Sequence, residues 1–324
     1  MRRVLVTGAT GNQGAAVIKA LQDLKVSEAF DILALTRNTT SPKAQALAAQ
    51  GVTLIEGDFS NCEAIFASIH EPIDAVYSVQ VNHKGTPEQV RHEEVEACAI
   101  IDAALKHRVS HFVQASGDRG GETRSWQDPT SVPHFATKFN IEQYLREKAA
   151  GSNMSWTILR PVTFMVSLTY QLNRRQNLTV RCQENYTADI RGRGFAAMWS
   201  NLGKKRLQLV STVDIGVFAA KAIAEPTSST FHNRAVSLAG DELTFDEACH
   251  VFQETYGHHA PMVPGFVGSI IQWSDKEIKS DFDWFRNVGL GADSQECKKV
   301  YPEMQDFRTW LVRTSAFGPA TWKA

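Results

Sequence analysis

The sequence predicts an α/β fold in which a doubly wound parallel sheet is followed by a smaller C-terminal α+β lobe. Three observations lead to this prediction. Short apolar runs alternate with longer helical patterns from residue 2 to about residue 160, a glycine-rich turn joins the first run to the first helical pattern, and the alternation weakens after Pro161. We therefore predict a sheet domain over residues 1–160 and a smaller lobe over residues 161–324, with part of the later span returning to the sheet.

Each predicted strand of the sheet domain is a short apolar run bounded by polar or turn residues. The six strands are predicted at Arg3–Val6, Asp31–Thr36, Val52–Glu56, Asp74–Val79, His111–Ala115 and Ser155–Leu159. The helices between them are predicted at Gln13–Leu24, from Ser41-Pro42 onward, and at Asn61–Ile69, Pro87–Lys106 and Phe135–Ala149. Strands that alternate with helices in this way predict a Rossmann-type sheet.

The second half of the chain is less regular. The stretch Gln171–Gly203 is polar and rich in arginine, which is typical of an insertion or a loop on the substrate side. Its arginines predict a solvated loop face or, alternatively, contact with a protein partner or an anionic substrate. Regular patterns resume after this stretch, with predicted strands at Leu207–Val210 and Ala235–Leu238 and a predicted helix at Val213–Ala224. Two further helices are predicted to begin at the capping boxes Thr244–Glu247 and Ser274–Glu277.

Composition excludes several classes of protein. The chain has 34 Lys+Arg against 35 Asp+Glu and 43% hydrophobic residues, so it is neither disordered nor strongly basic. We therefore expect no direct nucleic-acid partner. The longest apolar segment, Phe266–Trp273, is far shorter than the roughly 20 residues that span a bilayer, so we expect no membrane insertion. We expect a cytoplasmic protein, and a nuclear one as well if it is a regulator.

Cysteine and histidine spacing predicts no metal site. The five cysteines are scattered without a CxxC pair, and we expect free thiols. His107 and His111 straddle a helix end and a strand start, and the pair His258-His259 has no carboxylate at ligand spacing.

The strongest local motif is the Gly-x-x-Gly-x-x-Gly turn from Gly8 to Gly14. Gly8 suits a tight turn, Gly11 lets the backbone approach a pyrophosphate, and Gly14 lets the helix pack closely on the strand. The helix N-terminus then presents free N–H groups to phosphates. The motif predicts a dinucleotide site, and glycines that only serve a tight connection are the alternative.

The end of the second strand predicts the form of the dinucleotide. It carries Arg37 and Asn38 rather than an acid, and a guanidinium suits a 2′-phosphate, with Lys43 as a second contact. We therefore predict preference for NADP(H), with a solvated surface arginine as the alternative. Asp58, after the third strand, is placed to meet the adenine amino group or to cap a helix, and the two roles are compatible.

A second constellation lies on the fifth strand and the helix that follows it. Ser116 ends the strand, and His134 and Lys138, four residues apart, share one helix face. At this point the chain resembles the short-chain dehydrogenase/reductase superfamily and, more narrowly, the NmrA-like family. The residues that carry the resemblance are Thr7–Gly14, Thr36–Asn38, Gly57-Asp58, Gln114–Gly117, His134–Lys138, Ile158–Pro161, Asp214–Gly216 and Ala239–Thr244.

The resemblance implies a set of NADP(H) contacts along the chain. They are Gly8, Ala9, Thr10, Gly11, Asn12, Gln13, Gly14, Arg37, Asn38, Asp58, Phe59, Gln80, Val81, Asn82, Lys138, Thr163, Phe164, Met165 and Val166. It also implies catalytic roles for Lys138, His134 and Ser116, with Lys138 holding the ribose hydroxyls beside the nicotinamide.

The chain departs from the superfamily at His134, where a proton-donating Tyr would stand. Two functions follow from the resemblance. The first is an NADPH-dependent oxidoreductase that acts on a small organic substrate, with Lys138 as the essential cation and His134 or a water as the proton relay. The second is a non-catalytic NADP(H) sensor that regulates a transcription factor or another protein partner. The polar stretch Gln171–Gly203 fits a lid in the first case and a switch in the second.

Overall fold

The computed structural model describes residues 1–24, 29–80, 87–168, 191–260 and 263–315. These residues form two compact units. The first unit contains the described parts of Met1–Gly117, His134–Arg160 and Ile215–Val236, and the second contains those of Asp118–Pro133, Pro161–Asp214 and Ser237–Ala324. The units alternate along the chain. The sequence prediction placed a boundary at residue 160 and had part of the later span return to the sheet.

The first unit is built on a seven-stranded sheet with the order β3-β2-β1-β4-β5-β6-β9. Its strands are β1 (Arg2–Val6), β2 (Phe30–Thr36), β3 (Thr53–Glu56), β4 (Ala75–Ser78), β5 (His111–Ala115), β6 (Ser155–Pro161) and β9 (Arg234–Leu238). The pairs from β3 through β6 are parallel, and Val4 of β1 lies opposite Ile32 of β2 and Ala75 of β4. This order confirms the predicted doubly wound sheet.

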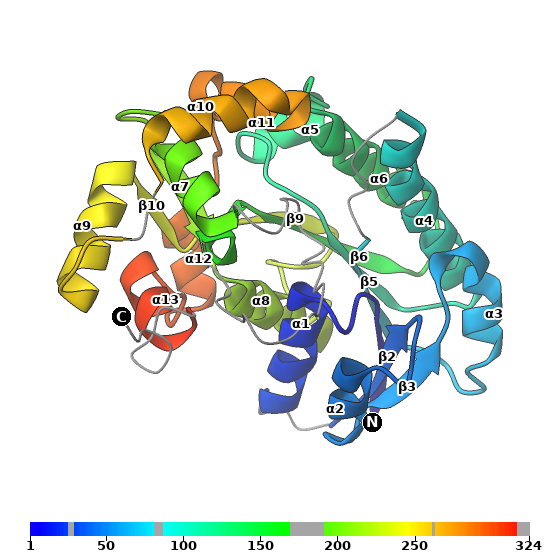
Figure 1. Ribbon diagram of the computed structural model, residues 1–324. Helices are drawn as coiled ribbons and strands as arrows, with labels where there is room; N and C mark the ends of the chain where they lie inside the picture. Colours follow the sequence, from blue (N-terminus) through cyan, green and yellow to red (C-terminus); the bar gives the residue numbers. More distant parts are fainter. Residues whose placement is uncertain (25–28, 81–86, 169–190, 261–262, 316–324) are drawn as a thin grey trace. The chain divides into compact units, whose positions relative to one another are not determined.

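Helices cover both faces of the sheet (Figure 1), which explains why Val4, Leu5 and Val6 of β1 are completely buried. The helices of this unit are α1 (Asn12–Asp23), α2 (Pro42–Ala48), α3 (Cys62–Ala67), α4 (Pro87–Lys106), α6 (Pro133–Ala149) and α8 (Thr212–Ala224), with a short 3-10 turn, η1 (Phe59–Asn61). The predicted start of α2 is confirmed, because Ser41 accepts a hydrogen bond from the Ala44 N–H and Pro42 opens the helix.

The second unit combines a small sheet with helices, which confirms the α+β character predicted for the later half. Its strands β7 (Thr163–Phe164), β8 (Leu207–Val210) and β10 (Asp241–Leu243) pair in the order β10-β8-β7. Its helical segments are α5 (Glu122–Gln127), η2 (Met165–Leu168), α7 (Arg191–Ser200), α9 (Phe245–Tyr256), α10 (Gly265–Ser274), α11 (Lys276–Asn287), α12 (Ser294–Val300) and α13 (Phe307–Arg313).

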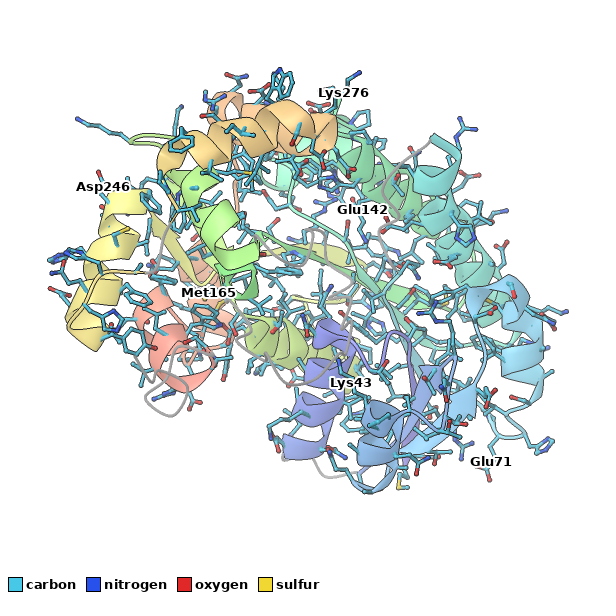
Figure 2. All side chains as sticks on the ribbon, viewed as in Figure 1. Lys43, Glu71, Glu142, Met165, Asp246 and Lys276 are labelled. Atoms are coloured by element: carbon cyan, nitrogen blue, oxygen red, sulfur yellow. The ribbon has the colours of Figure 1, made fainter. Side chains whose placement is uncertain are left out.

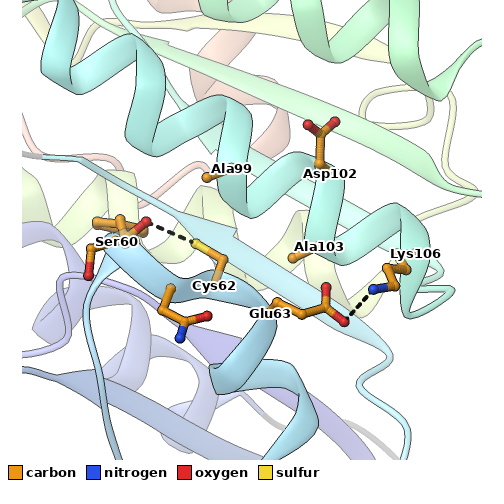
Figure 3. A pocket seen from close by; sticks show the side chains of 9 residues that line it. Ser60, Cys62, Glu63, Ala99, Asp102, Ala103 and Lys106 are labelled. Carbon is orange, nitrogen blue, oxygen red and sulfur yellow. Dashed lines mark hydrogen bonds and ion pairs between the residues drawn. The ribbon is translucent and has the colours of Figure 1, made fainter.

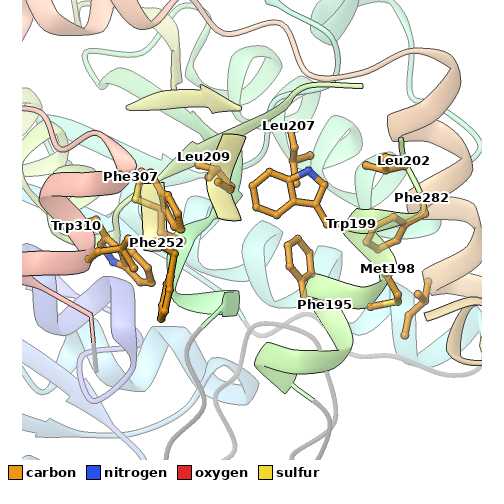
Figure 4. Close-up of a cluster of buried hydrophobic side chains, with 14 residues drawn as sticks. Phe195, Met198, Trp199, Leu202, Leu207, Leu209, Phe252, Phe282, Phe307 and Trp310 are labelled. Carbon is orange, nitrogen blue, oxygen red and sulfur yellow. The ribbon is translucent and has the colours of Figure 1, made fainter. Parts of the chain in front are cut away.

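An aromatic cluster forms the core of the second unit (Figure 4). Trp199, Phe282 and Trp310 are each at most 2% exposed and come from α7, α11 and α13. Burial of such rings supplies much of the stabilising free energy of a small unit. Most of the predicted polar stretch Gln171–Gly203 lies outside the described residues, but its end is the helix α7, which contributes Trp199 to the core.

One of the two predicted capping boxes is confirmed and the other is wrong. Thr244 and Glu247 form a complete capping box at the start of α9. The next cap is Asp275 rather than Ser274, because the Asp275 carboxylate accepts the N–H groups of Glu277 and Ile278 and starts α11 one residue later. The apolar segment Phe266–Trp273 lies within α10. No helix in the described part of the chain has the length and apolar character needed to cross a membrane.

Candidate functional site

The first unit has a topological switch point between β1 and β4, which is where ligands bind in open α/β sheets. Thr7, directly after β1, joins the two strand ends. Its Oγ1 accepts from the Val79 N–H at 2.8 Å and donates to the Val79 carbonyl at 3.1 Å, and its own N–H donates to the Tyr77 carbonyl at 3.0 Å. These bonds fix the start of the glycine turn against the end of β4.

The glycine turn needs its glycines for space. Gly8 has a φ of +57°, and a Cβ there would lie 2.7 Å from a methyl group of Val79. A Cβ on Gly14 would lie 2.3 Å from the Gly8 carbonyl oxygen. The first turn of α1 therefore packs directly on the backbone of the glycine turn, which holds the N-terminus of α1 over that turn.

The N-terminus of α1 fits a phosphate group. Its N-cap is Gly11, which provides no side-chain hydrogen bond, and the first turn contains no acidic residue. The first N–H groups of a helix have no partner within the helix, so this end offers donors and positive potential to an anion. Lys43 on α2 (Figure 2) adds a cation beside the turn, since its Nζ donates to the Thr10 carbonyl at 3.3 Å.

Arg37 and Asn38 follow β2 and are exposed. Asn38 is used locally, because its Oδ1 accepts from the N–H and the hydroxyl of Thr40 at 2.9 and 2.7 Å. Asp58 is the N-cap of η1, which starts at Phe59, and hydrogen bonds from Ser60 lower the pKa of its carboxyl, with a smaller contribution from the charge of Arg37. The capping role predicted for Asp58 is confirmed, and its adenine contact stays a prediction.

Glu96 on α4 is a neighbour of this group that the sequence analysis did not identify. The pKa of its carboxyl is raised to about 7, mainly by burial and also by the charges of Glu93 and Asp58, while the charge of Arg37 lowers it. The electrostatic coupling places Arg37, Asp58 and Glu96 together. Glu96 is an acid on a half-buried face of α4. This position is the only sign in the sequence that Glu96 could belong to the site.

The carboxyl ends of β4 and β5 are joined by a buried chain of polar side chains. Gln114 Nε2 donates to Gln80 Oε1 at 3.0 Å, and Gln80 Nε2 donates to the Ser78 hydroxyl at 2.7 Å. Gln13 on α1 is also buried, and its Oε1 accepts from the Tyr77 hydroxyl at 3.2 Å. The predicted contacts Val81 and Asn82 lie outside the described residues.

Lys138 on α6 forms an ion pair that the sequence did not predict. Its Nζ lies 2.6 Å from Oε1 of Glu93 on α4, and the side chains of Lys138 and Glu93 are 14% and 1% exposed. His134, one turn earlier on α6, is half-buried and packs against the ring of Phe135 with centroids 4.3 Å apart. Lys138 is therefore fixed by a helix distant in sequence, while His134 packs locally.

Ser116 belongs to a buried network rather than to an open surface. Its hydroxyl donates to Glu142 Oε1, and Glu142 accepts from Arg160 Nε at 3.1 Å and from Arg160 Nη2 at 2.6 Å. Glu142 lies on α6 (Figure 2), and neither it nor Arg160 is exposed. The hydroxyl proton of Ser116 thus points toward Glu142, and the catalytic role of Ser116 stays a prediction.

The remaining predicted contacts belong to the second unit. Thr163 and Phe164 form β7, which pairs with Leu209 and Val210 of β8. Met165 begins η2 and is completely buried in the aromatic cluster, whereas Val166 is half-buried. Their contact with a cofactor stays a prediction.

A separate pocket of about 280 Å³ lies between the η1–α3 segment and α4 (Figure 3). Cys62 lines it and donates to the Phe59 carbonyl at 3.6 Å, while Glu63 pairs with Lys106 at 2.7 Å. Burial raises the pKa of the Cys62 thiol to about 11, so the thiol stays protonated and is a poor nucleophile.

The sequence matches a known family over almost all of its length. A model of the NmrA-like family covers residues 1–311. The chain belongs to the NmrA-like family. An NmrA-like family domain-containing protein of Dictyostelium discoideum is 28% identical over 181 residues, which are 55% of this chain and 57% of that protein. The NmrA-like family domain-containing oxidoreductase hkm9 of Aspergillus hancockii is 24% identical over 274 residues, 81% of this chain and 75% of that protein.

Solved structures share the fold. The Citrobacter triphenylmethane reductase complexed with NADP(H) superposes with a TM-score of 0.66 at 17% identity, over 95% of this chain and 98% of that one. The Escherichia coli quinone oxidoreductase QOR2 complexed with NADPH gives a TM-score of 0.65 at 19% identity, over 94% of this chain and 97% of that one. At 17% and 19% identity, the structural similarity to these two proteins supports a shared fold.

Proposed function

We propose that this NmrA-like protein binds NADP(H) and is an NADPH-dependent oxidoreductase that reduces a small organic substrate. The observation that carries the proposal is the uncapped N-terminus of α1, held over the Gly8–Gly14 turn at the switch point between β1 and β4. A turn of this shape binds a pyrophosphate through backbone N–H groups. The names of one relative, an oxidoreductase, and of two structural neighbours, a reductase and a quinone oxidoreductase, support this function.

Each end of the proposed site has its own cation. Arg37, with Lys43 beside the turn, binds the 2′-phosphate and so favours NADPH over NADH. Lys138 donates hydrogen bonds to ribose hydroxyls and provides positive charge near the reacting atoms. NADPH supplies a hydride when it is bound, and the substrate then needs a proton, which His134 or a water delivers.

A sensor of NADP(H) is the second candidate function, and the Ser116 network favours it. The Ser116 hydroxyl donates to the buried Glu142, and His134 stands where the superfamily has a Tyr. Of the three catalytic groups that the resemblance implies, only Lys138 then keeps its expected chemistry. Such a protein binds the cofactor and reports it to a protein partner, without turnover.

Timed NADPH oxidation assays over quinones, enones and simple carbonyl compounds separate the two functions. We expect turnover for the wild type and a loss of about 100-fold or more for Lys138→Ala, which is the range for removal of a group that stabilises charge in the transition state. Lys106→Ala is the control, since this lysine is 67% exposed and pairs with Glu63. Tight NADPH binding without turnover on any substrate class favours the sensor, and no binding of NADPH rejects both functions.

A further inference from the structure

The first unit contains a buried acid that the mechanism above does not use. Glu93 on α4 is 1% exposed, and its Oε1 is the atom that lies 2.6 Å from Lys138 Nζ. Its other oxygen, Oε2, is buried and accepts no hydrogen bond from any residue that the structure describes. Buried carboxylate oxygens in native proteins are nearly always hydrogen-bonded, so this oxygen is suited to a donor from a ligand.

The face of α4 that carries Glu93 extends along the proposed cofactor site. Glu93 and Glu96 are three residues apart, so they lie on the same side of the helix. Glu96 interacts electrostatically with Arg37 and Asp58, which belong to the end of the site proposed for the 2′-phosphate. Glu93 contacts Lys138, which belongs to the nicotinamide end. The two acids are therefore neighbours on one face of α4, and Glu93 is the one that contacts Lys138.

The Glu93–Lys138 pair has the chemistry of a diol site. The ammonium group of Lys138 only donates hydrogen bonds, and the carboxylate of Glu93 only accepts them. Each hydroxyl of a vicinal diol does both. A ribose hydroxyl oxygen can therefore accept a hydrogen bond from Nζ while a hydroxyl of the same sugar donates a hydrogen bond to Oε2. The charges of Lys138 and Glu93 make both bonds strong.

Resting on the proposed NADP(H) function, we propose that Glu93 is a cofactor-binding residue whose Oε2 accepts a hydrogen bond from a hydroxyl of the nicotinamide ribose, while Lys138 donates to the same sugar. Glu93 thereby makes the site specific for a ribose with both hydroxyls, and it aligns Lys138 with that sugar.

The test compares two ligands on three proteins. NADPH contains the nicotinamide ribose, whereas 2′,5′-ADP contains the 2′-phosphate without it. We expect Glu93→Gln to weaken NADPH binding about tenfold and to change the Kd of 2′,5′-ADP less than about twofold. Glu94→Gln is the control, because Glu94 also joins α4 to α6, through Asn140 at 3.0 Å, without contacting Lys138. It should leave both Kd values unchanged.

The other results overturn the proposal. An equal loss for both ligands shows that Glu93 only supports the fold, and an unchanged Kd for NADPH shows that the ribose does not contact it. A changed substrate KM with an unchanged NADPH Kd shows that Glu93 contacts a hydroxyl of the substrate instead. If Glu93→Gln does not fold, the double variant Glu93→Met/Lys138→Met, which replaces the buried ion pair with apolar side chains, is compared with Lys138→Met. The double variant should bind NADPH more weakly than Lys138→Met and keep 2′,5′-ADP, and an equal loss of NADPH shows that Glu93 does not contact the ribose. A wild type that binds neither ligand rejects the NADP(H) function itself.

Discussion

A Cβ on Gly14 would lie 2.3 Å from the carbonyl oxygen of Gly8, because the first turn of α1 packs directly on the backbone of the glycine turn. The backbone atoms of Gly8 and Ala9 leave no room for a methyl group. We expect Gly14→Ala to lower the free energy of unfolding by about 1–3 kcal/mol, the usual cost of overpacking. Urea denaturation measures this loss.

Gly11→Ala is the matched variant, and it should affect the ligand rather than the fold. Gly11 has a φ of -89°, which alanine adopts, and its Cβ would lie 3.2 Å from the Gly8 carbonyl oxygen, which requires only a small shift. We expect a nearly unchanged unfolding midpoint and a Kd for NADPH raised by about tenfold or more, because the methyl group obstructs the approach of the pyrophosphate. Equal destabilisation of both variants contradicts this division of roles.

Arg37 decides the choice between NADPH and NADH if it binds the 2′-phosphate. We expect Arg37→Glu to lower the ratio of NADPH to NADH affinity by about tenfold or more, since a charge-assisted hydrogen bond is replaced by repulsion. Arg146→Glu, a charge reversal of an exposed residue near the end of α6, is the control. Titration of both variants with both cofactors gives the ratio, and an unchanged ratio assigns Arg37 to the solvated surface.

The Ser116 network predicts that Ser116 matters more for stability than for turnover. Ser116→Ala removes one donor to the buried Glu142 but keeps the pair between Glu142 and Arg160, so we expect a loss of about 1–3 kcal/mol. Glu142→Gln breaks the pair and should cost about 3–5 kcal/mol. For Ser116→Ala, kcat/KM should stay within about threefold of wild type. A fall of 100-fold at unchanged stability would instead establish a catalytic role.

The parts of this fold that depend on local pattern were predictable. The strands and the Gly8–Gly14 turn are visible as patterns within a few consecutive residues. All the strands predicted for the sheet domain are present. The partners Glu93 and Glu142 were not predicted, because each meets its cation through tertiary packing. Glu93 on α4 meets Lys138 on α6, 45 positions later, and Glu142 on α6 meets Arg160 on β6, 18 positions later. One signal was available: Glu93 is in helical register with the buried Ala97, Ile100 and Ala104, and an acid within an apolar stripe requires a partner.

The second unit shows the limit of local pattern in another way. The two-residue strand β7 is defined by its pairing with β8, and a run so short has no period of its own. The start of α11 was misplaced by one residue because Ser274 and Asp275 are both good caps, and only the hydrogen bonds to Asp275 distinguish them.

Asp214 predicts a dependence of stability on pH. It lies in the first turn of α8, at the point where the chain passes from the second unit to the first. Its side chain is completely buried, its Oδ2 accepts from the Gln305 N–H at 3.0 Å, and its Oδ1 has no hydrogen-bond partner in the described part of the chain. Burial raises the pKa of this carboxyl from its usual value of 3.8 to about 7. The folded state therefore holds the proton more tightly than the unfolded state, and stability that is fully present below pH 3.8 is lost as the pH rises through about 7.

Asp214→Asn removes this titration while keeping an oxygen that accepts from Gln305. The difference in unfolding free energy between variant and wild type should therefore increase from pH 5 to pH 8, toward an upper value of about 4 kcal/mol for a shift of about three pKa units. Denaturation curves at several pH values measure the difference, and the exposed Glu303→Gln is the control. A difference that is constant over this range contradicts the prediction, because it means that Asp214 is ionised in the folded protein at both ends of the range.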